Sequence, residues 1–331
     1  MIQPDINERN VNLWSKIGPR ATYGQAILSL AGKDPNVIAV SADLGNSSGL
    51  ERMAKAFPER FIDTGIAEQN LIGFASGLAK EGFTVFASSF APFITMRACE
   101  QIRMNLGYME HNVKAVGIGS GLSMGFLGNS HFGLEDVSVI SSIPNIQIVS
   151  PADGAEIFNA VYAVAQTNNP TYLRLTGAPG IKPVYGSSYE FELGKAITLK
   201  ESGNFGILGT GAVVSTALDA SMVLEKDGIN CSVTNFHTLR PLDVEKLLQI
   251  ASSSDAIFVI EEHFDFGGLY STVANVLMKH HILMPIYSIG IEHRFDLSGD
   301  YDFLKDYHGL TSEGISKTIK RAVSTIDSWK R

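Results

Sequence analysis

The sequence predicts a two-domain α/β protein whose sheets are mainly parallel. Short β-branched, apolar runs alternate with amphipathic segments along most of the chain, a pattern typical of sheets covered by helices. Residues 176–188 are rich in glycine, proline and serine and interrupt this alternation, which then resumes. The length of 331 residues is also enough for two domains of ordinary size.

The first part of the chain contains five apolar runs that we expect to be buried parallel strands. They cover residues 37–42, 84–89, 113–118, 146–149 and 171–175. The segment 66–80 is predicted to be a helix, because apolar residues recur at helical spacing from Leu71 to Leu78. Further helices are expected at 92–108 and directly after Asp153, whose side chain can cap a helix. Right-handed crossovers would then give a doubly wound sheet.

The second part of the chain repeats the alternation on a smaller scale. Strands are expected at 205–209, 231–236, 256–262 and 284–290, with a helix between the first two. We therefore predict a first domain at residues 1–180, a linker at 181–190 and a smaller α/β domain at 191–331.

Composition excludes several classes of protein. The 26 basic and 34 acidic residues give a formal charge of −8, which argues against binding nucleic acid through bulk charge. The polar start and the lack of any long apolar run predict neither a signal peptide nor a membrane span. Cys99 and Cys231 are too few for a disulfide framework or a zinc site, and suit a reducing compartment. We expect a cytoplasmic enzyme or binding protein.

Two glycine clusters, at 117–125 and 209–214, do not complete a dinucleotide-binding motif. Leu122 and Val214 stand where the third glycine of G-x-G-x-x-G belongs, and no acidic residue ends the strand after the second cluster. Both clusters are therefore interpreted as strand-to-helix turns, and a nicotinamide-dependent dehydrogenase is disfavoured.

A carboxylate, two aromatic rings and an imidazole follow successive predicted strands. Glu68 opens an apolar helix, Phe90 and Phe93 follow a strand, and His131 lies in a loop before another helix. Each has an ordinary alternative: a first-turn acid, a core ring or an exposed histidine. Because they all lie at the carboxyl edge of one predicted sheet, they predict a ligand pocket there.

Several motifs in order give the chain a resemblance to a known family. They run from residue 20 to about 325 and include SADLG, GIAEQN, SSFAPF, RACEQIR, SHFGLED, IPNIQIVSPAD, HTLRPLD and EEHFDFGG. In these the chain resembles the C-terminal two-thirds of transketolase, and most of all the small subunits of split transketolases. The resemblance implies a thiamine-diphosphate-binding fold: a pyrimidine-binding parallel sheet flanked by helices, followed by the smaller transketolase C-terminal domain.

The resemblance also implies roles for individual residues. Glu68 corresponds to the glutamate that hydrogen-bonds N1′ of the cofactor's aminopyrimidine and so promotes loss of the thiazolium C2 proton. Phe93 corresponds to the aromatic residue that stacks on that ring, and Phe90 lines the same pocket. Asp43 and Leu44 correspond to residues beside the cofactor.

Two further residues correspond to substrate-binding positions of the family. His131 matches the histidine that contacts substrate hydroxyls, and Ser47 matches a serine that helps to bind a terminal phosphate. Arg174 and Glu261 also lie in family-typical segments but are interpreted as structural.

The chain departs from the family where the diphosphate and its Mg²⁺ are bound. The usual Gly-Asp-Gly with a downstream Asn is missing, and Gly299-Asp300 lies too near the end to replace it. We therefore expect no metal site in this chain. A partner subunit related to the N-terminal part of transketolase should hold the diphosphate and Mg²⁺, in an α₂β₂ heterotetramer with a contact between the β chains.

The substrate site departs from the family as well. Leu127 stands where an aspartate contacts the acceptor, Gly119 or Ser120 where a histidine binds phosphate, and Gly177 near the position of an arginine. One hypothesis is an acceptor without an ordinary terminal phosphate, such as a nucleotide-linked keto sugar. The alternative is that Lys182 or the partner supplies the missing charge.

The predicted function is therefore the small subunit of a two-component transketolase that uses thiamine diphosphate. It transfers a two-carbon ketol unit between a ketose donor and an aldehyde or keto-sugar acceptor. Alternatives are the β subunit of a 2-oxo-acid dehydrogenase, an enzyme like deoxyxylulose-phosphate synthase, and a non-catalytic regulatory paralogue.

Overall fold

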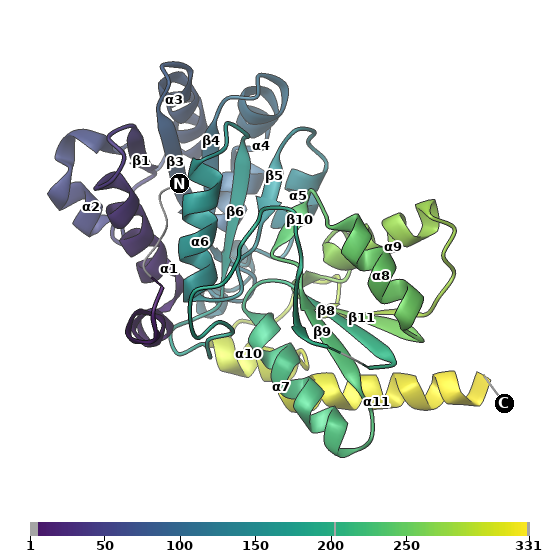
Figure 1. Cartoon of the computed structure of the whole chain (residues 1–331). Helices are drawn as coiled ribbons and strands as arrows, with labels where there is room; N and C mark the ends of the chain where they lie inside the picture. Colours follow the sequence, from purple (N-terminus) through teal and green to yellow (C-terminus); the bar gives the residue numbers. More distant parts are fainter. Residues whose placement is uncertain (1–5, 202, 330–331) are drawn as a thin grey trace.

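The computed structural model describes residues 6–201 and 203–329, which form two sheets with helices on their faces (Figure 1). The first sheet contains β1 (Val37–Ser41), β2 (Phe61–Asp63), β3 (Thr84–Phe90), β4 (Val113–Ser120), β5 (Gln147–Val149), β6 (Thr171–Thr176) and β10 (Thr238–Arg240). The second contains β7 (Ile197–Lys200), β8 (Phe205–Gly209), β9 (Cys231–Asn235), β11 (Ala256–Phe264) and β12 (Ile286–Ile291).

Both sheets are mainly parallel, as the sequence predicts. The strand order is β10-β5-β6-β4-β3-β1-β2 in the first sheet and β12-β11-β8-β9-β7 in the second. The antiparallel pairs are those of β10 with β5 and of β7 with β9, each at a sheet edge. The predicted α/β class is therefore confirmed, and every strand expected from an apolar run is present.

The helices cover both faces of the sheets. They are α1 (Glu8–Ala31), α2 (Glu51–Ala56), α3 (Glu68–Lys80), α4 (Cys99–Ile102), α5 (Asp136–Ser141), α6 (Gly154–Ala165), α7 (Val213–Lys226), α8 (Val244–Ser253), α9 (Leu269–Lys279), α10 (Tyr301–Tyr307) and α11 (Ser312–Trp329). Short turns of 3₁₀-helix form η1 (Pro58–Arg60) and η4 (Gly125–Ser130), and turns of π-helix form η2 (Phe93–Arg97) and η3 (Arg103–Tyr108). Among the described residues, no helix is both long and apolar enough to cross a bilayer.

The single helix expected at 92–108 is wrong in detail. Two π-helical turns, η2 and η3, flank the short α4, so the segment is wider than an α-helix at both ends. Such turns make room for an extra residue in a helix and are frequent at functional sites. The turn η2 carries Phe93 at its start and Arg97 at its end.

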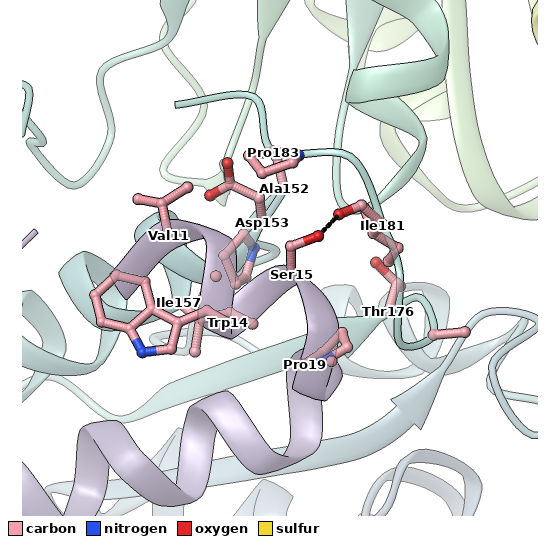
Figure 2. Close-up of a pocket in the computed structure, with 14 residues that line it drawn as sticks. Val11, Trp14, Ser15, Pro19, Ala152, Asp153, Ile157, Thr176, Ile181 and Pro183 are labelled. Carbon is pink, nitrogen blue, oxygen red and sulfur yellow. Dashed lines mark hydrogen bonds between the residues drawn. The ribbon is translucent and has the colours of Figure 1, made fainter. Parts of the chain in front are cut away.

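The segment between the sheets is packed against the first of them. Asp153 caps α6 as predicted, because its Oδ1 accepts a hydrogen bond of 2.9 Å from the Glu156 amide. Its Oδ2 also accepts from the amides of Val184 and Tyr185, within the predicted linker. Figure 2 shows the Ser15 hydroxyl of α1 donating to the Ile181 carbonyl, at 2.5 Å. The proposed boundaries at 181 and 190 stay a prediction.

The two sheets also share apolar core. One cluster of buried side chains includes Val85 and Ala115 of the first sheet together with Leu208 and Ile257 of the second. The strand β10 strengthens the connection, because it follows β9 of the second sheet in sequence but pairs with β5 of the first. The carboxyl ends of the first sheet's strands are thus held in a fixed frame.

Candidate active site

The predicted pocket residues follow the carboxyl ends of neighbouring parallel strands. Asp43 and Leu44 follow β1, Glu68 opens α3 after β2, and Phe90 ends β3. The strands β2, β1, β3 and β4 are adjacent in that order, so their carboxyl ends lie along one edge. This is where ligands bind in open α/β sheets.

Glu68 is a buried carboxylate with two hydrogen-bond donors. Its side chain is only 2% exposed. Its Oε2 accepts from Nη1 of Arg97 at 2.7 Å, and its Oε1 accepts from the hydroxyl of Ser89 at 3.3 Å. Because Glu68 is the first residue of α3, the helix dipole also favours its negative charge. The site therefore holds one well-oriented carboxylate at its base.

Three rings gather beside this carboxylate. The ring centroids of Phe90 and Phe93 are 6.0 Å apart, and His131 lies 5.7 Å from Phe90 and 5.1 Å from Phe93. All three pairs meet edge to face, a favourable geometry for aromatic rings. The Oγ atom of Ser130 lies 2.8 Å from Nδ1 of His131 and orients the imidazole. The structure thus brings the predicted carboxylate, aromatics and imidazole together.

Asp43 and Leu44 form a tight turn at the end of β1. Asp43 has a left-handed backbone, with φ of 57°, which is uncommon for a residue other than glycine. Its amide donates to Oδ1 of Asp63, which also accepts from the amide of Gly65. The Leu44 amide donates to the hydroxyl of Ser41. The loop after β1 is thereby tied to the loop that leads into Glu68.

Ser47 lines a cavity of about 350 Å³ together with Arg20, which was not among the predicted site residues. The guanidinium of Arg20 donates to the carbonyl of Ser47 at 3.3 Å. Asn46, Ser123 and Gly177 also line this cavity. A cation therefore lies beside the predicted phosphate-binding serine, but it comes from α1. In the sequence, the one indication that Arg20 could bind a ligand was its position at the start of the region that resembles the family.

The positions where the family's phosphate-binding residues are missing have structural explanations. A Cβ on Gly177 would lie 2.0 Å from Ile181, and one on Gly119 would lie 2.5 Å from Met124. The Ser120 hydroxyl is buried and donates to the Gly117 carbonyl. Lys182 is paired with Asp219, at 2.5 Å, so its charge is already matched.

Arg174 and Glu261 make structural contacts, as the sequence predicts. Arg174 is 1% exposed and donates to Asp136 and to the carbonyls of Gly133 and Glu262. Glu261 accepts from two amides at the start of α9. Leu127, in contrast, is exposed on η4. The partners of Arg174 and Glu261 named here do not include any of the predicted site residues.

The group of residues around Glu68 is compatible with the aminopyrimidine half of thiamine diphosphate, the cofactor that the resemblance implies. The planar guanidinium of Arg97 donates to Glu68 while its carbon lies 4.3 Å from the centroid of the Phe93 ring. A flat group with a hydrogen-bond donor can thus contact this carboxylate and this ring at once. Within residues 6–201 and 203–329, no three His, Cys, Asp or Glu side chains are grouped so that they could hold a metal ion.

Comparisons with known proteins identify the family of the chain. Residues 15–178 match the model of the transketolase pyrimidine-binding domain, and residues 194–315 match that of the transketolase C-terminal domain. A putative transketolase C-terminal section of Methanocaldococcus jannaschii is 36% identical over 91% of this chain and 95% of its own length. One of the subunits of the apulose-4-phosphate transketolase of Phocaeicola vulgatus is 34% identical over 91% of this chain and 96% of its own.

One more relative in sequence and one solved structure are also similar to this chain. The 6-deoxy-6-sulfo-D-fructose transketolase subunit SqwH of a Clostridium species is 36% identical over 94% of this chain and 95% of its own. Among solved structures, a split-gene transketolase described as an inactive beta4 tetramer superposes with a TM-score of 0.83. It has 35% identity and covers 93% of this chain and 98% of its own.

Proposed function

The chain belongs to the transketolase family, and on that premise we propose that it is the small subunit of a two-component transketolase that uses thiamine diphosphate. Its reaction is the transfer of a two-carbon ketol unit from a ketose donor to an aldehyde or keto-sugar acceptor. The observation that carries this proposal is the buried Glu68, which Arg97 links to the ring of Phe93, with His131 in edge-to-face contact with that ring. A scaffold would have no use for an acid held in this way.

The side chains of this pocket have distinct tasks in the proposed reaction. When bound, thiamine diphosphate supplies a carbon nucleophile and an electron sink. Glu68 holds a hydrogen bond to the aminopyrimidine and thereby controls where its proton resides. Phe93 supports the face of that ring, and Phe90 fixes the orientation of Phe93 through their edge-to-face contact. His131, beside both rings, is placed to contact substrate hydroxyls.

A partner subunit is part of the proposal. Relatives that match over nearly their whole length are described as transketolase subunits, and this supports a division of the enzyme between two chains. We propose that the partner holds the diphosphate and Mg²⁺ and that the assembly is an α₂β₂ heterotetramer with contact between β chains. Location in the cytoplasm also stays a prediction.

The cavity beside Ser47 bears on the acceptor. Arg20 supplies a cation beside Ser47, so the cavity suits an anionic group at the end of a sugar. Two relatives are described as acting on a sulfonated and on a phosphorylated sugar. These observations favour an acceptor with a terminal anionic group, either a phosphate or a sulfonate.

The test is to co-express the chain with a neighbouring chain that carries Gly-Asp-Gly and a downstream Asn. The purified complex should transfer a ketol unit to ribose 5-phosphate when thiamine diphosphate and Mg²⁺ are present. Glu68→Gln should lower the rate by about 10²- to 10⁴-fold without dissociating the complex. Glu100→Gln, which removes an exposed carboxylate from the nearby α4, should leave the rate unchanged.

Other results would redirect the proposal. Full activity of Glu68→Gln would support a non-catalytic subunit. Pyruvate-dependent reduction of an artificial electron acceptor would support a 2-oxo-acid dehydrogenase. Efficient use of ribose 5-phosphate would exclude the hypothesis that the acceptor carries no ordinary terminal phosphate.

A further inference from the structure

Arg97 occupies the place that the proposed function gives to the aminopyrimidine ring. Its guanidinium donates to Oε2 of Glu68 at 2.7 Å, and its central carbon lies 4.3 Å from the centroid of the Phe93 ring. It therefore uses both groups through which the pocket would recognise the ring: the carboxylate and the aromatic face.

The guanidinium and the aminopyrimidine cannot occupy this position together. A stacked ring needs the face of Phe93 at van der Waals distance, and the guanidinium already lies at that distance. The ring would also have to share Glu68 with the groups that already donate to it, Arg97 at Oε2 and Ser89 at Oε1. Arg97 must therefore leave before the ring can bind in the proposed orientation.

The surroundings of Arg97 allow it to leave. Its side chain is 47% exposed although Glu68 is only 2% exposed. Arg97 is the last residue of the π-helical turn η2. Because nearly half of its side chain is exposed, water can replace the hydrogen bond to Glu68 when the guanidinium rotates away. In the described part of the chain, Glu68 is the carboxylate with which Arg97 forms an ion pair.

We propose that Arg97 is an internal competitor of the cofactor: it neutralises Glu68 and covers Phe93 in the isolated subunit, and cofactor binding displaces it. The inference rests on the proposed function, because it takes this pocket as the aminopyrimidine site. Its physical consequence is that apparent affinity for the ring is reduced by the fraction of molecules in which Arg97 is docked. Free subunits thus keep their acid paired until the ring arrives.

The test uses thiamine as the probe, because it carries the aminopyrimidine but no diphosphate and so needs no metal. Its binding to the full chain is measured by titration calorimetry for the wild type and for Arg97→Met. The variant should bind thiamine about tenfold more tightly, because the competing state is removed. The matched control is Arg103→Met, which removes the same charge from an exposed pair with Glu100 and should leave binding unchanged.

The remaining outcomes separate this inference from the proposed function. Equal or weaker binding by Arg97→Met overturns it, provided Glu68→Gln still weakens binding, because the pocket is then correct and the competition is not. If Glu68→Gln also has no effect, both the pocket assignment and the inference fail. Should thiamine binding be too weak to measure in every chain, titration of thiamine diphosphate into the two-subunit complex at fixed Mg²⁺ decides. Tighter binding by Arg97→Met there supports the inference, and unchanged or weaker binding overturns it.

Discussion

Two arginine–carboxylate pairs of this chain have nearly the same length but different surroundings. The closest contact is 2.8 Å between Arg174 and Asp136 and 2.7 Å between Arg97 and Glu68. Arg174 and Asp136 are 1% and 0% exposed, whereas Arg97 is 47% exposed above a Glu68 that is 2% exposed. Both members of the first pair are shielded from solvent, whereas in the second pair the arginine is accessible to solvent.

The difference separates a pair that maintains the fold from one that can be exchanged. Arg174 also donates to the carbonyls of Gly133 and Glu262, so it joins the first sheet to β11 of the second. Desolvating such a pair is expensive, and losing one member leaves a buried charge without compensation. Around Glu68, solvent and an incoming ligand can replace the cation. Distance alone therefore does not identify a functional ion pair.

The largest expected effect comes from breaking the pair that is shielded from solvent. Arg174→Met should lower the free energy of unfolding by about 3–5 kcal/mol, since it leaves Asp136 buried and unpaired. Denaturant unfolding measures this, with Arg97→Met as the comparison, for which we expect a loss of about 1–2 kcal/mol. If Arg174→Met does not fold, Arg174→Lys serves instead. Equal losses at both positions would remove the distinction between the pairs.

A third buried carboxylate, Glu156, sharpens the comparison because, within the described residues, it forms no ion pair with an arginine. The donors to it are the amide group of Asn235, the backbone amide of Ala152 and the hydroxyl of Tyr189. Burial raises the pKa of Glu156 from 4.5 to about 7. The folded state thus prefers the protonated acid. The contribution of Glu156 to the stability of the folded state is fully present below pH 4.5 and is lost as the pH rises to about 7.

Glu156→Gln should therefore remove much of the loss of stability between pH 5 and pH 8, by up to about 3 kcal/mol. Unfolding curves at the two pH values measure this, with the exposed Glu192→Gln as the control. A smaller pH dependence of stability should remain in the variant, because burial also raises the pKa of Asp153 to about 6. If the stability of Glu156→Gln depends on pH as that of the wild type does, Glu156 is not the group that causes the loss of stability.

The smallest effect on stability is expected at Arg20, whose guanidinium contacts a carbonyl and, within the described residues, forms no ion pair. Arg20→Met should change the free energy of unfolding by less than about 0.5 kcal/mol. In the assembled enzyme, however, it should raise KM for a phosphorylated acceptor by about 10- to 100-fold. Lys182→Met is the control, because Lys182 is paired with Asp219. If Lys182→Met raises KM and Arg20→Met does not, the anion cavity is misassigned.

The sequence was sufficient for elements with a strong, uninterrupted pattern. All the long apolar runs became strands, and the stripe from Leu71 became α3. The helix α1 was not predicted, because Gly18, with φ of 80°, and Pro19 break its periodicity. The edge strands β7 and β10 were also missed, since each is short and pairs antiparallel with a strand that its own residues do not identify.

The candidate site was predictable where chemistry and position coincide along the chain. Glu68, Phe90, Phe93 and His131 follow strands in order, and the structure brings them together. Arg97 and Arg20 were not assigned roles, although both lie in family-like segments. Their importance depends on which carboxylate or carbonyl they approach in space, and side-chain direction at a π-helical turn or a helix kink is not encoded in residue spacing.

The short strand β10 has a practical consequence for engineering. It belongs to the C-terminal half of the chain but closes the edge of the first sheet, and Arg240 at its end donates to the carbonyls of Ser141 and Ile143. A fragment cut at the linker would expose β5 as a bare edge, which invites aggregation. Chimeras between related subunits should therefore exchange residues 236–241 together with the N-terminal half, rather than crossing over once at the linker.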